Sequence, residues 1–123
     1  MAAPNLIGAT TINGKTATAN LTTTAATTVI NNPASSGKCL KINVLNVANY
    51  NVVTVNVSIG FYNAANVGGS LFPIVGYVDV PAKSTLNVID KTSQYYLEEN
   101  TSIGAFAGFA NSLCVTCSYE DIS

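Results

Sequence analysis

The sequence predicts an all-β protein, a single antiparallel β-sandwich that is jelly-roll-like, and three observations support this. Apolar and polar residues alternate with a period of two along much of the chain, most clearly over residues 53–62, as in strands with one buried face. Turn residues separate the alternating stretches at spacings of roughly 8–12 residues, which is typical of sandwiches and barrels. No stretch has a helical period, and 123 residues are the length of one domain.

Residues 1–35 are predicted to form an N-terminal hairpin or arm of the same domain, and residues 36–123 the sandwich body. Asn13-Gly14 lies between two short alternating stretches and predicts a hairpin on a type I′ turn. The tract 22–28 contains only Thr and Ala. Because these side chains bury little area, the tract suits an edge strand or an intermolecular arm. Residues 32–37 are expected to be a loop.

In the body, residues 40–47 and 53–62 are predicted strands, joined as a hairpin by turn residues 48–51. The apolar phase slips by one residue between Val44 and Leu45, which predicts a β-bulge. Pro73 in the next strand favours an edge position or a bulge.

Later strands are predicted over residues 72–80, 86–88, 95–97, 103–109 and 113–119. The core is expected to contain the apolar members of these alternations: Ile42, Val44, Val55, Val57, Ile59, Phe72, Ile74, Leu86, Val88, Ile103 and Val115.

The charge balance excludes several classes of partner. Only 9% of the residues are charged, and the formal net charge is −1 with no histidine. A nucleic-acid-binding module needs a basic stripe, and a polybasic membrane patch needs clustered lysines. The chain has no run of about 18 apolar residues that could span a bilayer, and its first residues lack the positive charge of a secretory signal. We therefore expect no nucleic-acid or membrane partner, and a protein made in the cytoplasm.

No catalytic, metal or cofactor site is expected. Cys114 and Cys117 form a C-x-x-C, but residues three apart in a strand point to opposite faces, so Cys117 is expected in the core and Cys114 partly exposed. Without histidine, the available bases are carboxylates and lysines, and the adjacent acids at 98–99 and 120–121 are interpreted as solubilising. A calcium site at residues 98–100 is a weaker interpretation, because the residues match no calcium-loop pattern. We expect a protein that is not an enzyme.

The remaining function is carried by the surface. Six tyrosines accompany few charges, and tyrosine is favoured at protein interfaces. An edge strand of small side chains also lets a neighbouring strand pair with its main chain. The candidate interface residues are Thr22, Thr23, Thr24, Thr27, Thr28, Tyr50 and Tyr62.

Several short motifs resemble a group of short virion structural proteins of tailed phages, notably those of cyanobacteria. The resemblance covers nearly the whole chain. It is carried by Met1-Ala2-Ala3-Pro4-Asn5, Asn13-Gly14-Lys15-Thr16-Ala17, Val80-Pro81-Ala82-Lys83-Ser84-Thr85-Leu86, Tyr96-Leu97-Glu98-Glu99 and Ser118-Tyr119-Glu120-Asp121-Ile122-Ser123. The group often has Gly-Asp after the paired glutamates, where this chain has Asn100-Thr101, a change that alters the turn.

The resemblance implies a component of the virion, and three functions compete for it. The first is a capsid decoration (cement) protein, expected to be a homotrimer that binds the major capsid protein on the outside of the head. The second is a tail, collar or baseplate component. The third is a glycan-binding fibre domain, which the absence of tryptophan disfavours, because sugars stack on exposed aromatic rings. The expected location is the virion capsid surface.

Overall fold

A computed structural model describes residues 8–90 and 92–123, and this part of the chain forms nine strands. The strands are β1 (Ile12–Leu21), β2 (Thr27–Asn32), β3 (Cys39–Asn49), β4 (Val55–Ala64), β5 (Gly68–Val80), β6 (Thr85–Ile89), β7 (Tyr95–Leu97), β8 (Thr101–Ala107) and β9 (Leu113–Ile122). Within the same residues, no helix is long and apolar enough to cross a membrane.

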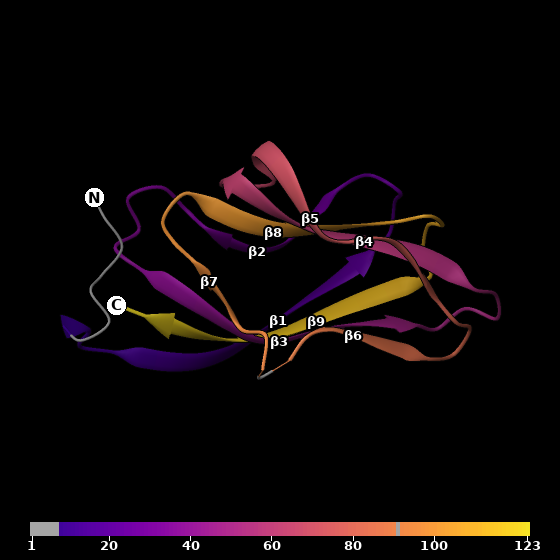
Figure 1. Cartoon of the computed structure of the whole chain (residues 1–123), viewed down its shortest axis with the longest axis horizontal. Helices are drawn as coiled ribbons and strands as arrows, with labels where there is room; N and C mark the ends of the chain where they lie inside the picture. Colours follow the sequence, from indigo (N-terminus) through magenta and orange to yellow (C-terminus); the bar gives the residue numbers. More distant parts are fainter. Residues whose placement is uncertain (1–7, 91) are drawn as a thin grey trace.

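The strands form two antiparallel sheets that lie face to face (Figure 1). One sheet has the order β1-β9-β3-β6, with β7 also paired to β3, and the other has the order β2-β8-β4-β5. The pairing is nested: β1 pairs with β9, β2 with β8, β3 with β6 and β7, and β4 with β5. A long hairpin that folds over into two sheets gives this order, which is that of a jelly roll. The all-β sandwich predicted from the sequence is confirmed.

The core lies between the sheets, and most of the predicted core residues are in it. Ile42, Val55, Val57, Ile59, Ile103 and Val115 are all at most 3% exposed, while Ile74, Leu86 and Val88 are half-buried against them. Phe72 was expected in the core but is 53% exposed. It lies on β5, the edge strand of its sheet, so its ring has a neighbouring strand on one side only.

The predicted bulge is confirmed in β3. Its pairing with β9 shifts register between Ile42 and Val44, and Leu45 and Val47 then continue the buried face. Val44 follows the extra residue and is half-buried rather than in the core, because the bulge reverses which parity faces inward.

The predicted hairpin between residues 40–47 and 53–62 is wrong. β3 and β4 lie in different sheets, and residues 50–54 cross from one sheet to the other. The crossing is held by Asn49, whose buried side-chain amide donates to the carbonyls of Val53 and Val80, both at 2.9 Å. Asparagine was expected to supply turn geometry, but here it satisfies main-chain carbonyls at the point where the strands separate.

The hairpin predicted on Asn13-Gly14, within the predicted hairpin or arm (1–35) that precedes the body (36–123), is also wrong. β1 runs straight through Asn13-Gly14 and pairs with β9 along its whole length, and β2 pairs with β8. Leu21, Val29 and Ile30 are part of the core. A turn signal reports local geometry only, whereas β1 is fixed by a partner about one hundred residues away in the chain. Residues 1–7 of the predicted arm lie outside the described residues.

Candidate interaction surface

The connections between sheets gather at the two ends of the sandwich, and one end is almost free of charge. We call this the loop end and define it as residues 22–26, 50–54, 81–84 and 108–112. Among these residues only Lys83 is charged. Main-chain hydrogen bonds hold the connections together: Tyr50 N–H to Ser112 O at 3.1 Å, Asn111 N–H to Leu21 O at 3.0 Å, and Asn49 N–H to Ser84 O at 2.8 Å.

The loop end exposes large apolar side chains. Tyr50 is 52% exposed, Val52 73%, Val53 47% and Phe109 55%. The two connections that carry them are joined by a hydrogen bond from the Asn51 side-chain amide to Ser112 Oγ at 2.8 Å. Apolar side chains gathered on one nearly uncharged surface are typical of a surface that binds another protein.

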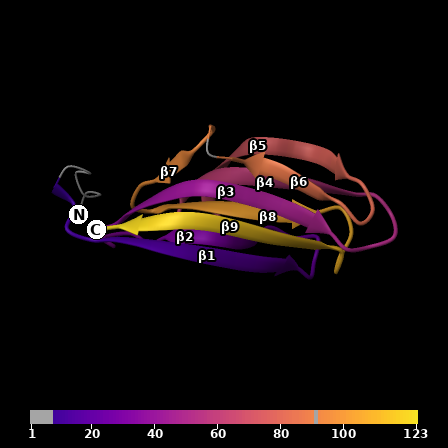
Figure 2. The ribbon, with the colours of Figure 1, turned by 90° about the horizontal axis from the view of Figure 1, so that it is seen from below.

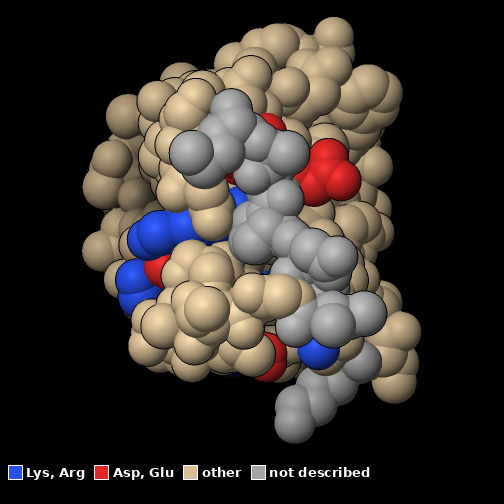
Figure 3. Space-filling view, turned by 90° about the vertical axis from the view of Figure 1, so that its left-hand side faces the viewer, with Lys and Arg blue, Asp and Glu red and all other residues tan. Residues whose placement is uncertain are grey.

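The opposite end is charged, as Figure 3 shows. Its centre is Asp121, whose Oδ2 accepts hydrogen bonds from Lys15 Nζ at 2.9 Å and Lys38 Nζ at 3.1 Å. Burial alone would raise the pKa of Asp121, but the hydrogen bonds and positive charges of the two lysines together outweigh burial and lower it. This cluster ties β1, β9 and the connection before β3 together, so its charges have a structural role.

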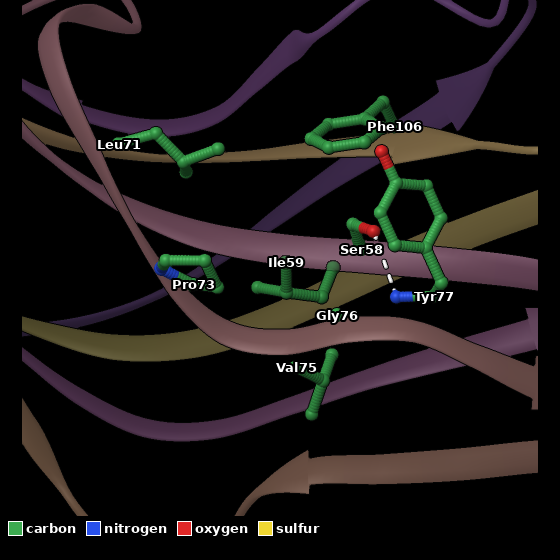
Figure 4. Close-up of a pocket in the computed structure, with 8 residues that line it drawn as sticks. All are labelled: Ser58, Ile59, Leu71, Pro73, Val75, Gly76, Tyr77 and Phe106. Atoms are coloured by element: carbon green, nitrogen blue, oxygen red, sulfur yellow. Dashed lines mark hydrogen bonds between the residues drawn. The ribbon is translucent and has the colours of Figure 1, made fainter.

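A shallow apolar groove of about 90 Å³ lies on the outer face of the β2-β8-β4-β5 sheet (Figure 4). It is built by a bulge in β5. Val57 pairs with Val78 and Ile59 with Val75, so two residues of β5 stand opposite Ser58. One of them is Tyr77, with a φ of 53°; this left-handed conformation is uncommon for a tyrosine.

The bulge directs the Tyr77 ring across the outer face of the sheet. The Tyr77 N–H donates to Ser58 Oγ at 2.9 Å, and the ring meets Phe106 edge to face with 6.0 Å between centroids. The lining is otherwise apolar: Ile59, Leu71, Pro73, Val75 and Gly76 complete it. Sites for small ligands occupy roughly 300–1,000 Å³, so this groove is smaller than such a site.

The structure brings some of the predicted interface residues together. Thr22, Thr23 and Thr24 are exposed at the loop end, where Tyr50 also lies, although they form a connection and not the edge strand that was predicted. Thr27 and Thr28 are half-buried at the start of β2.

The prediction that Tyr62 is an interface residue is wrong, because its side chain is only 7% exposed. Its ring lies over Gly104, so close that a Cβ added at Gly104 would stand 2.9 Å from Tyr62 Cε1. Burial also raises the pKa of the Tyr62 hydroxyl.

Sequence reasoning missed Val52, Val53, Phe109 and Tyr77 as surface residues. Val53 and Phe109 were interpreted as parts of alternating strands, because a valine or phenylalanine at a strand end has the same pattern as one in the core. Val52 was assigned to no element. The neighbouring Asn and Gly residues are typical of turns and could have indicated that these residues lie in connections between strands.

The cysteines lie as predicted. Cys117 is fully buried and Cys114 half-buried, on opposite faces of β9, and burial raises the pKa of the Cys117 thiol to about 12. Over residues 8–90 and 92–123, no group of three or more cysteine or carboxylate side chains is placed to hold a metal ion.

Comparison with known proteins gives little that is similar to this chain. No protein-family model matches it, and no curated protein matches it. Among solved structures, a chain of "Structure of infectious bursal disease virus Gx strain" is similar with a TM-score of 0.34 and 10% sequence identity, covering 89% of this chain and 40% of that chain. The chain thus spans less than half the length of that viral chain.

Proposed function

We propose that this protein is a virion structural protein of a tailed phage, a capsid decoration protein that binds the outside of the head and bridges major capsid subunits. The observation that carries the proposal is the loop end: Tyr50, Val52, Val53 and Phe109 are exposed together on a surface with one charged residue. Such a surface favours a partner that is itself protein and that offers apolar area.

Two further facts support a structural role in a particle. The jelly roll is an architecture that viral capsid proteins use, together with lectins and cupins, although a fold alone does not set a function. The short motifs quoted above resemble virion structural proteins of tailed phages. Together with the loop end, they favour assembly over catalysis.

We expect each contact with the shell to have low affinity, and the binding of a subunit that makes several contacts to be strong. The four apolar side chains offer little area compared with the roughly 800 Å² per partner of a standard interface. An icosahedral head presents many identical sites, and a subunit that bridges two neighbours gains affinity through effective concentration. Because the loop end is nearly uncharged, binding should depend only mildly on salt.

Two phenylalanines give a matched test of the docking surface. Phe109 at the loop end is 55% exposed and Phe72 on β5 is 53% exposed, so an aspartate at either position perturbs the isolated protein to a similar degree. Phe109→Asp should lower occupancy on heads at least tenfold, since losing about 1.4 kcal/mol of apolar contact is tenfold in affinity. Phe72→Asp should bind as the unmodified protein does.

The measurement is co-sedimentation of each purified variant with heads that lack the protein. Equal binding by both variants would contradict docking through the loop end. Counting copies in purified virions separates the head from the tail, because a shell protein is present in hundreds of copies. A dozen copies or fewer would favour a tail, collar or baseplate component instead.

A further inference from the structure

The two sheets leave four edges, and three of them are blocked against pairing with another chain. β5 contains Pro73 and three register shifts, one of which is the bulge at Tyr77. β2 is six residues long with a register shift of its own. The edge beside β3 is divided between β6 and β7, of five and three residues. Short strands, bulges and proline are the features by which proteins prevent edge-to-edge association.

β1 has none of these features. It is ten residues long, contains no proline, and pairs with β9 through ten consecutive residue pairs without a register shift. Figure 2 shows β1 along the outer edge of its sheet, and no described strand lies beyond it. An antiparallel edge strand has every second pair of main-chain groups directed outward, so β1 offers a regular row of unpaired donors and acceptors.

The one charge on β1 does not block this edge. Lys15 Nζ lies 2.9 Å from Asp121 Oδ2, so the side chain is directed toward β9 of its own subunit. The other residues of the strand are uncharged and mostly small: Ile12, Asn13, Gly14, Thr16, Ala17, Thr18, Ala19, Asn20 and Leu21. Small side chains allow a second main chain to approach closely.

We propose that β1 pairs with β1 of a second copy of this chain, antiparallel about a two-fold axis, so that one sheet continues through two subunits. The same strand on both sides makes the contact self-complementary, which closes it as a dimer. An axis through Thr16 places Thr16 opposite Thr16, Gly14 opposite Thr18, and Lys15 opposite Ala17. The two lysines are therefore not opposed, and no charge is buried without a partner.

This pairing uses a different surface from the loop end and does not depend on the proposed function. The loop end remains free in the dimer, so a dimer would present two loop ends to whatever they bind. The sequence predicted a homotrimer but did not say which strand edge would form it. Measuring the mass of the oligomer distinguishes that trimer from the dimer proposed here.

The chain provides a matched pair of variants for the test. Thr16→Lys with Thr18→Lys places lysines opposite lysines across the two-fold axis, whether the axis passes through residue 16 or residue 17. The control is Thr85→Lys with Asn87→Lys on β6: these residues are also exposed, and Asn87 lies in the same cross-strand row as Thr18, Thr116 and Asn46 on the same face. Both double variants add the same charge, so a general charge effect changes them equally.

Sedimentation equilibrium of the full chain measures the result. The unmodified protein and the β6 control should reach twice the monomer mass of 12.7 kDa with the same dissociation constant, and the β1 variant should dimerise at least tenfold more weakly. A monomer at every concentration, a trimer, or an equal effect of both variants would overturn the proposal.

Amide hydrogen exchange assigns the dimer contact to β1. In a monomer, alternate amides of an edge strand exchange rapidly because they have no partner. In the proposed dimer, the alternate amides of residues 12–20 become protected as concentration rises. A dimer in which these amides still exchange rapidly associates through another surface and contradicts the inference.

Discussion

Replacing Val115 by aspartate should unfold most of the protein, whereas the same change at the neighbouring Thr116 should not. Both residues lie on β9, which is paired on both sides by β1 and β3. Val115 is 0% exposed and belongs to the core. Thr116 points to the opposite face and is half-buried between Thr18 and Asn46. Two adjacent residues of one strand are therefore expected to differ greatly in how much an aspartate destabilises the fold.

The size of the effect follows from burial. Removing the valine loses about 1.5–3 kcal/mol of apolar transfer energy. The carboxyl group must then lie in the core unpaired or take up a proton, and holding its pKa two to three units above 3.9 costs about 3–4 kcal/mol at neutral pH. The sum of roughly 4–7 kcal/mol is comparable with the 5–15 kcal/mol that stabilises a typical domain. Thr116→Asp should cost about 1 kcal/mol, because aspartate is a poor strand residue.

Urea denaturation followed by far-ultraviolet circular dichroism measures both variants. The Val115→Asp protein should lose most of its strand signal without denaturant, and the Thr116→Asp midpoint should shift only slightly. Equal shifts in the two variants would refute the assignment of the inner face of β9. A helical spectrum of the unmodified protein would refute the fold.

Three other predictions follow from buried groups. Asp121→Asn should lower the free energy of unfolding by about 1–2 kcal/mol at neutral pH. Because the pKa of Asp121 is lowered in the folded state, its contribution to stability is complete above about pH 4 and is lost as pH falls through the folded pKa. The free energy of unfolding should therefore change less with acid pH in the variant than in the unmodified protein. Gly104→Ala should lower the melting temperature by the equivalent of about 1–3 kcal/mol, since its Cβ would clash with Val67 Cγ1 and lie 2.9 Å from Tyr62 Cε1; an unchanged melting temperature contradicts those close contacts. Mass spectrometry after mild alkylation should find Cys114 modified and Cys117 untouched, because burial raises the Cys117 pKa to about 12; the reverse order would contradict their placement.

Most strands of the sandwich were predictable from the sequence, because their own residues carry a two-residue alternation. β2 was not predicted as a strand, because its Thr-rich start has no such alternation. The β3 bulge was predictable, since the phase slip at Val44 and Leu45 is local. Which strand pairs with which was not predictable. β1 and β9 meet from opposite ends of the chain, and no feature of residues 12–21 specifies that partner, so Asn13-Gly14 was interpreted as a turn.

The surface was predictable only in part. The low charge and the abundance of Thr and Tyr indicated a protein-binding surface, and Tyr50 with Thr22, Thr23 and Thr24 do lie at one end. Whether an apolar residue is buried depends on what the opposite sheet covers. This explains why Phe72 was assigned to the core, Phe109 to a strand and Tyr62 to the surface.

Cryo-electron microscopy of purified virions tests the proposed function most directly. We expect jelly-roll density on the outside of the head in hundreds of copies, with residues 50–54 and 108–112 turned toward the major capsid protein. A bare shell with the density at the tail or neck, or density whose loop end faces away from the shell, would contradict it.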